Sequence, residues 1–98
     1  MSKNIIWSSQ AEKDLITILE YLDLHWYKEV TITFLDILDQ KVIKIAGQPE
    51  LFPYFDKNHN IRKCVVTKHN TLYFREETSE IQVLRIYDVR QHPDKLHF

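Results

Sequence analysis

Residues that break helices and strands are rare in this chain. Its 98 residues include one glycine and three prolines, the two residue types that most often end regular elements. Such a chain must consist mostly of long helices and strands joined by short turns. Its length is close to that of one hydrophobic core, and its 44% hydrophobic and 28% charged residues are ordinary for a soluble globular protein. We therefore expect a single domain over residues 1–98.

Two amphipathic helices are predicted in the first half of the chain. Apolar residues recur at intervals of three and four over residues 11–26, and again over residues 30–45. A capping box formed by Ser9 and Glu12 marks the start of the first helix, and Gly47, followed by a proline, marks the end of the second. Because the link between them is very short, the helices must fold back on each other as an antiparallel hairpin.

Strands are predicted on both sides of the hairpin. Residues 3–7 form a short first strand, and residues 61–67, 71–76 and 81–89 form three more, separated by turn pairs that predict an antiparallel meander. Residues 49–60 are expected to be an irregular connector. This order indicates an α+β two-layer sandwich, with the helices on one side of the sheet and the first strand at or beside its edge.

Several kinds of site and location are excluded by simple features. The single cysteine, Cys64, can form neither an internal disulfide nor a thiolate zinc cluster, and its apolar surroundings predict a buried, inert thiol. His92 and His97 stand in no regular ligand spacing, and no phosphate-binding glycine loop or dinucleotide fingerprint is present. We therefore predict no metal and no cofactor. The absence of a long apolar run and of a signal peptide predicts a cytoplasmic protein without membrane contact.

Charge is distributed unevenly along the chain. Residues 1–53 hold five Lys or Arg and eight Asp or Glu, whereas residues 54–98 hold eight and six. The net charge of −1 argues against strong charge-driven binding of nucleic acid by the whole molecule. Any anion-binding surface is expected on the C-terminal half.

Short segments along nearly the whole chain carry a family likeness. One is a polar turn followed by Ala-x-x-Asp-Leu, and another is a Tyr-aromatic-Arg segment followed by Ile-x-Val-Leu. The segments that carry the likeness are residues 6–15, 18–21, 45–49, 61–63, 73–75, 81–87 and 90–93. In this order and spacing they resemble the RelE/ParE family of toxins from type II toxin–antitoxin pairs, which includes plasmid stabilisation proteins, and the ParE-like members more than the RelE-like ones. The resemblance implies the same strand–helix–helix–three-strand fold.

The resemblance implies two activities, between which a fold cannot decide. RelE-like members resemble ribosome-dependent endoribonucleases that cut messenger RNA, and ParE-like members look like inhibitors of DNA gyrase. The RelE-like pattern has basic residues on the sheet, which Arg62 and Lys63 match, and an arginine after the last strand, which Arg90 matches. It also has an arginine on the middle meander strand and a tyrosine near the C-terminus, where this chain has Thr71 and Leu96.

These two departures favour a toxin that acts by binding a macromolecular target, DNA gyrase, and that is silenced by a cognate antitoxin. The expected target-binding residues are Lys63, Arg75, Arg85 and Tyr87. The alternative is an mRNA endoribonuclease of RelE type, with phosphate-binding arginines and a tail histidine as acid or base. Its expected catalytic residues are Arg62, Arg90 and His92. Whether the chain is an enzyme stays open at this point. Each cation on the sheet could also have no function beyond facing solvent or pairing with a carboxylate.

Five apolar residues of the two predicted helices lie outside the main apolar stripes. The hairpin is therefore either buried on two sides or keeps apolar surface for a partner. The resemblance implies that the antitoxin's C-terminal segment lies along the hairpin and the sheet. The expected antitoxin contacts are Ile16, Leu24, Ile32, Leu35 and Ile43. A homodimer and a heterotetramer with the antitoxin are both compatible with this arrangement.

Overall fold

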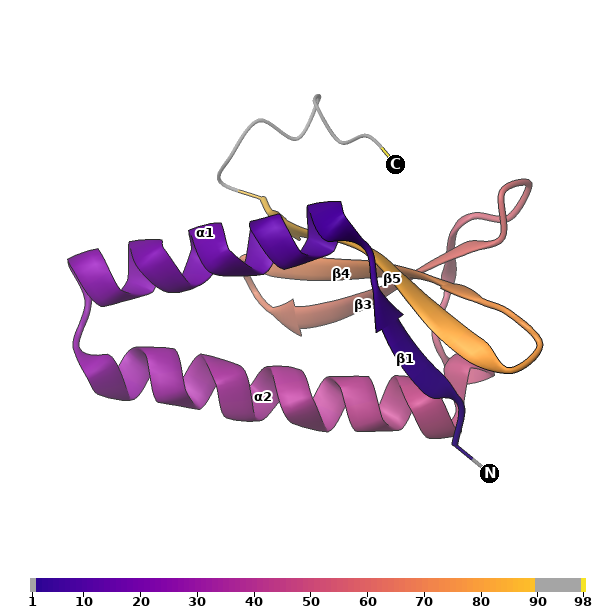
Figure 1. Ribbon diagram of the computed structural model, residues 1–98, viewed down its shortest axis with the longest axis horizontal. Coiled ribbons are helices and arrows are strands. Elements are labelled where there is room, and N and C mark those ends of the chain that lie inside the picture. Colours follow the sequence, from indigo (N-terminus) through magenta and orange to yellow (C-terminus); the bar gives the residue numbers. More distant parts are fainter. Residues whose placement is uncertain (1, 90–97) are drawn as a thin grey trace.

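The chain folds into two helices and a five-stranded sheet, in a computed structural model that describes residues 2–89 and 98. In chain order the elements are β1 (Asn4–Trp7), α1 (Ser9–His25), α2 (Lys28–Gly47), the 3₁₀ turn η1 (Pro49–Leu51), β2 (Tyr54–Asp56), β3 (Ile61–Thr67), β4 (Asn70–Glu76) and β5 (Glu80–Asp88). The helices form the expected antiparallel hairpin beside the sheet (Figure 1). The α+β class and the predicted element order are confirmed.

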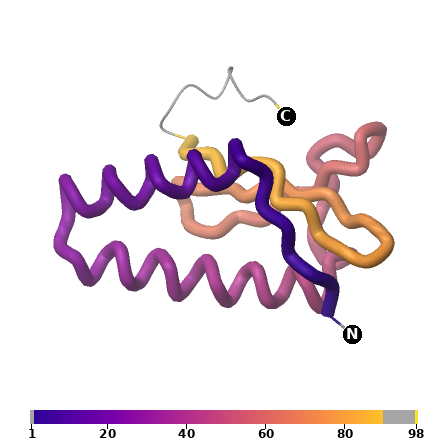
Figure 2. Tube along the Cα trace, viewed as in Figure 1, coloured from indigo at the N-terminus to yellow at the C-terminus, as the bar shows by residue number. Residues whose placement is uncertain are grey.

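The strand order in the sheet is β1-β5-β4-β3-β2. Strands β2 to β5 pair antiparallel, and β1 pairs parallel with β5 at the edge, as expected. The link between the helices lies at the end of the molecule opposite the N-terminus (Figure 2). The connector expected over residues 49–60 is more ordered than predicted, because it contains η1 and the short edge strand β2. No helix among residues 2–89 has both the length and the hydropathy needed to span a bilayer.

The main core lies between the helices and the central strand β4. Leu72 and Phe74 on β4 and Ala11 on α1 have no exposed surface. Cys64 on β3 belongs to this core and is 2% exposed, which confirms the predicted burial of its thiol. Burial raises the pKa of the Cys64 thiol, so this cysteine stays protonated and unreactive at neutral pH.

The N-cap of the first helix lies one residue earlier than predicted. Ser8, and not Ser9, is the N-cap, and its hydroxyl accepts a hydrogen bond from the backbone nitrogen of Ala11 at 3.0 Å. The same hydroxyl donates to the carbonyl oxygen of Leu84 on β5 at 2.8 Å. The sequence pattern Ser-x-x-Glu does not contain this long-range partner, which explains why the predicted capping box lies one residue too late.

Strand β5 contains a β-bulge in its middle. Val83 pairs with Phe74 and Arg85 pairs with Tyr73, so Leu84 has no partner on β4. The extra residue reverses the alternation of side chains along the strand. The residues of β5 that belong to the main core are Ile81, Val83 and Ile86. Without the bulge, apolar side chains from both halves of β5 could not all point to the face of the sheet that packs against the helices.

The start of α1 satisfies polar groups on the part of β5 that extends beyond its pairing with β1. Asp14 accepts hydrogen bonds from Arg85 Nε at 2.7 Å and Nη2 at 3.0 Å, and from the backbone nitrogen of Ile86 at 3.1 Å. The Arg85 and Asp14 side chains are 17% and 15% exposed, and the hydrogen bond to Asp14 raises the pKa of Arg85. We call Ser8, Asp14, Leu84, Arg85 and Ile86 the bulge clasp.

Removing the acidic member of the bulge clasp should cost much of the stability of the fold. Asp14→Ala leaves a largely buried guanidinium and a backbone N–H without their acceptor, which predicts a loss of about 3 kcal/mol in the free energy of unfolding. Urea denaturation followed by circular dichroism measures this loss. The matched control is Glu76→Ala, which removes a more exposed ion pair with Lys3 and should cost no more than about 1 kcal/mol. Equal losses in the two variants would show that the bulge clasp contributes no more stability than an ordinary ion pair.

Candidate functional site

The sheet has an outer face, which is turned away from α1 and α2. A second, smaller cluster lies on it and consists of the buried residues Ile61, Tyr73 and Tyr87, with the partly buried Leu84 packed against them. Residues opposite each other on paired strands point to the same side, so Lys63, which pairs with Tyr73, lies on the outer face. Arg75 follows Tyr73 by two residues on β4 and shares this face by alternation. The outer face therefore combines aromatic rings with cations from the C-terminal half.

All four expected target-binding residues lie on the outer face by strand pairing and alternation, since Arg85 pairs with Tyr73. Lys63 is exposed and Arg75 is half-buried, with Arg75 Nε donating to the carbonyl oxygen of His59 at 3.2 Å. Tyr87 is only 8% exposed, so it supports this surface more than it forms it. The fourth, Arg85, differs from the other three because its guanidinium is engaged by Asp14 of α1 in the bulge clasp.

Arg62 and Lys63 are neighbours in sequence but point to opposite sides of β3. Arg62 pairs with the core residue Phe74, and its guanidinium binds the segment before and in β2. Nη1 donates to the carbonyl oxygen of Phe52 at 2.6 Å, and Nη2 donates to the Tyr54 hydroxyl at 3.0 Å. The guanidinium also lies 4.0 Å from the centre of the Tyr54 ring. The structure thus gives Arg62 a role in fixing the edge of the sheet.

The other two expected catalytic residues, Arg90 and His92, lie outside the described residues. Their placement relative to Arg62 therefore stays a prediction. Among residues 2–89 and 98, no group of three or more His, Cys, Asp or Glu side chains is arranged to hold a metal ion.

An Asp–His pair borders the outer face and was missed in the sequence. Asp56 Oδ2 lies 2.7 Å from His59 Nδ1, and this hydrogen bond lowers the pKa of Asp56. The pair lines a hollow of about 390 Å³ together with Arg75, Leu84 and Phe98. Both residues fall in the segment predicted as an irregular connector. The only signal for the pair was the Asp-x-x-His spacing across a turn, which is common in loops and has low specificity.

Aromatic rings from three separate parts of the chain meet on the outer face. The centre of the Phe55 ring on β2 lies 4.8 Å from that of Tyr73 on β4, edge to face. The ring of Phe98 lies 5.7 Å from Phe55 and 5.2 Å from Tyr73. Burial raises the pKa of the Tyr73 hydroxyl, so this group is a neutral hydrogen-bonding group at physiological pH. The cluster offers apolar contact beside the cations of Lys63 and Arg75.

The expected antitoxin contacts lie on the surface of the helical hairpin. The exposed fractions of four side chains are 55% for Ile16, 80% for Leu24, 50% for Ile32 and 69% for Ile43. Leu35 is half-buried. Of the two alternatives left by the sequence, the described structure therefore has the hairpin that keeps apolar surface.

Comparison with known proteins places this arrangement in a family. A model of the ParE toxin of the type II toxin–antitoxin system parDE matches residues 5–93. A search of curated protein sequences found no match.

Solved structures share the fold at low sequence identity. A chain of the chromosomal ParDE system from P. aeruginosa superposes with a TM-score of 0.75 at 19% identity, over 90% of this chain and 97% of that one. A copper-bound mutant toxin from Helicobacter pylori gives 0.64 at 14% identity, over 96% and 99%. The E. coli DinJ–YafQ toxin–antitoxin complex gives 0.60 at 14%, over 90% and 93%. The structural likenesses show the fold, and the family model, which spans nearly the whole sequence, shows that this chain belongs to the ParE toxin family of type II toxin–antitoxin systems.

Proposed function

We propose that this toxin acts by binding its target, DNA gyrase, through the outer face of the sheet, and that a cognate antitoxin neutralises it. The observation that carries the proposal is the separation of the basic residues. Cleavage of RNA needs a base, an acid and phosphate-binding cations that converge on one bond. Within the described residues, Arg62 and Lys63 lie on opposite faces of β3, and Arg85 is held by Asp14.

The outer face suits binding to a large partner. Lys63 and Arg75 stand beside the aromatic cluster of Phe55, Tyr73 and Phe98. Interfaces that bind tightly combine desolvated aromatic anchors with a charged rim that steers the approach of the partner. A cation on this rim acts mainly on the rate and strength of association, and it needs no catalytic geometry.

A supercoiling assay with purified protein tests the proposal. We expect the toxin to inhibit gyrase, and Lys63→Glu to weaken the inhibition about tenfold, because the change reverses a charge on the binding face. The matched control is Lys28→Glu, an exposed charge reversal at the start of α2, which should leave inhibition unchanged. Full gyrase activity at a large excess of toxin would contradict the proposal.

A cleavage assay with the same toxin distinguishes gyrase binding from the ribonuclease alternative. The feature that favours the alternative is the Asp56–His59 pair, which lines one hollow with Arg75 and so sets an imidazole beside a cation. Primer extension on translated messages would show discrete new 5′ ends if the toxin cleaves RNA. New ends that disappear in His59→Ala, together with unaffected gyrase, would replace the binding function by the ribonuclease.

The exposed apolar residues of the hairpin serve the antitoxin in this proposal. Ile32 and Ile43 are eleven residues apart on α2, which is about three helical turns, so they lie on one stripe. A stripe of this length suits the apolar side of an antitoxin segment.

Ile43→Glu should leave the toxin toxic but weaken its neutralisation, since a carboxylate would be buried against the antitoxin. Growth of cells that express the variant with and without the neighbouring open reading frame measures both properties. Leu51→Glu, at an apolar position on η1 that is also exposed, at 59%, is the control and should be neutralised normally. Normal neutralisation of Ile43→Glu would remove this residue from the antitoxin contact.

A further inference from the structure

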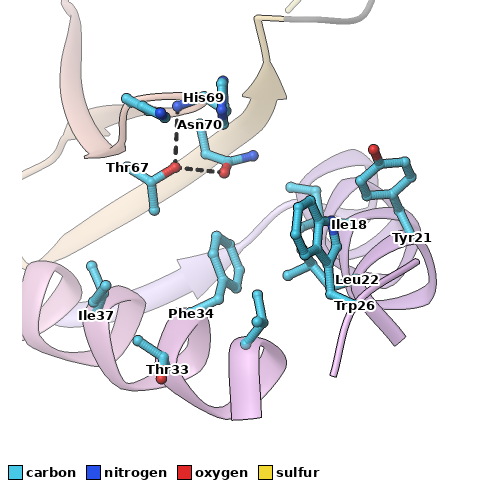
Figure 3. A pocket seen from close by; sticks show the side chains of 12 residues that line it. Ile18, Tyr21, Leu22, Trp26, Thr33, Phe34, Ile37, Thr67, His69 and Asn70 are labelled. Atoms are coloured by element: carbon cyan, nitrogen blue, oxygen red, sulfur yellow. Dashed lines mark hydrogen bonds between the residues drawn. The ribbon is translucent and has the colours of Figure 1, made fainter. Parts of the chain in front are cut away.

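A groove of about 420 Å³ lies where the two helices join, between them and the turn that connects β3 to β4. Its apolar walls come from both helices and its polar floor comes from the turn, residues 67–70 (Figure 3). The apolar side chains that line it include Ile18, Leu22, Trp26, Val30, Phe34 and Ile37. We call this cavity the link groove. None of the residues expected to contact the target or the antitoxin lines it.

The floor of the link groove carries a buried donor with no acceptor. Asn70 is 5% exposed. Its Oδ1 accepts the proton of the Thr67 hydroxyl at 2.8 Å, while that hydroxyl accepts from the backbone nitrogen of His69 at 3.2 Å. These bonds fix the orientation of the amide and leave Nδ2 without a hydrogen-bond partner among residues 2–89 and 98. In Figure 3 this nitrogen points away from Thr67, toward the side of the groove formed by α1.

The missing partner of Asn70 must combine two chemical properties. Nδ2 needs an acceptor oxygen, because buried donors are normally paired. The surrounding walls need an apolar group, because side chains of this kind gain from losing contact with water. A peptide segment offers both, since a large apolar side chain stands next to carbonyl oxygens of the same backbone.

The rim of the groove favours a polypeptide over a small molecule. Tyr21, Trp26 and Val30 line the groove and are 41%, 55% and 37% exposed. Beyond the rim, Leu24 and Tyr27 at the link between the helices are 80% and 82% exposed. Exposed apolar surface that continues outside a pocket marks a protein–protein contact more often than a site for an isolated small ligand.

We infer that the link groove anchors a polypeptide partner. One large apolar side chain of the partner fills the groove, and a backbone carbonyl beside that side chain accepts a hydrogen bond from Asn70 Nδ2. The assignment rests on the proposed function only in identifying this partner as the antitoxin. The sequence predicted antitoxin contacts only at exposed apolar residues of the hairpin, and the link groove adds a polar contact to them. Asn70 then determines the register of the bound segment.

A titration followed by ¹H–¹⁵N NMR tests the chemistry of the groove directly. The probe is N-acetyl-L-leucinamide, which carries an apolar side chain between two carbonyls. We expect saturable shifts of the Asn70 side-chain NH₂ and of the Trp26 indole N–H, while the indole of Trp7 on β1, the other tryptophan of the chain, stays unchanged. N-acetylglycinamide, which has the carbonyls without the side chain, should give no saturable shift.

Variants separate the polar anchor from the apolar walls. Asn70→Leu should weaken binding of the probe about fivefold, as expected for one lost hydrogen bond. Should that variant fail to fold, Val30→Glu at the rim should weaken it by at least as much, against Leu51→Glu as the matched control with unchanged binding. Equal affinity in Asn70→Leu, or equal shifts with N-acetylglycinamide, would overturn the inference.

The readout is independent of toxicity and of gyrase. Probe binding at Asn70 by a protein that inhibits neither growth nor gyrase would reject the proposed function and leave the groove assignment standing. Absence of any saturable shift in a protein that is fully toxic and neutralised by its antitoxin would reject the groove assignment alone.

Discussion

The hydrogen bonds from Arg85 and Ile86 to Asp14 hold together the two layers of this small toxin. Strand β1 pairs with β5 only as far as Val83, so the backbone groups on that edge of β5 beyond Val83 need other hydrogen-bond partners. The start of α1 supplies those partners, with Ser8 at the carbonyl of Leu84 and Asp14 at the N–H of Ile86. The helix is thereby fixed at its N-terminal end to the strand that also pairs with β1, so helix, bulge and edge strand depend on one another.

The bulge also determines what each face of the sheet presents. Because alternation reverses at Leu84, the helical face receives Val83 and Ile86, and the outer face receives Leu84 and Tyr87. The outer face can then assemble an aromatic cluster with Lys63 and Arg75, whereas Arg85 is drawn toward α1. One cation of the C-terminal half, Arg85, thus serves a structural ion pair, while Lys63 and Arg75 belong to the outer surface of the sheet.

Much of the fold could be predicted from the sequence, because its signals are local and periodic. The stripes of apolar residues predicted both helices, and the spacing of turn pairs predicted the meander. The features that were missed depend on long-range partners. The hydroxyl of Ser8, which caps α1, also binds the carbonyl of Leu84, and Arg62 binds Phe52 and Tyr54 at the edge strand β2. Strict alternation along β5 gives no sign of an extra residue.

The candidate site was predicted in part for the same reason. Lys63 and Arg75 share a face because they lie on strands whose alternation is regular, whereas Tyr87 reaches that face only through the bulge in β5. Arg62 was grouped with Lys63, although adjacent residues of a strand point to opposite sides. The role of Asn70 could not be predicted, since a buried unpaired amide beside a turn has no sequence signature. Asn70 lines the link groove only because residues of α1 and α2, which are distant in the sequence, form the other sides of that groove.

The dependence of the fold on Asp14 can be measured at a single backbone group. In native-state hydrogen exchange, the amide of Ile86 should exchange as slowly as that of Phe74 at the centre of the sheet, because Asp14 serves as its acceptor in place of a strand partner. Exchange of the Ile86 amide within minutes, while Phe74 stays protected, would show that Asp14 does not protect this edge of β5 and would contradict this account.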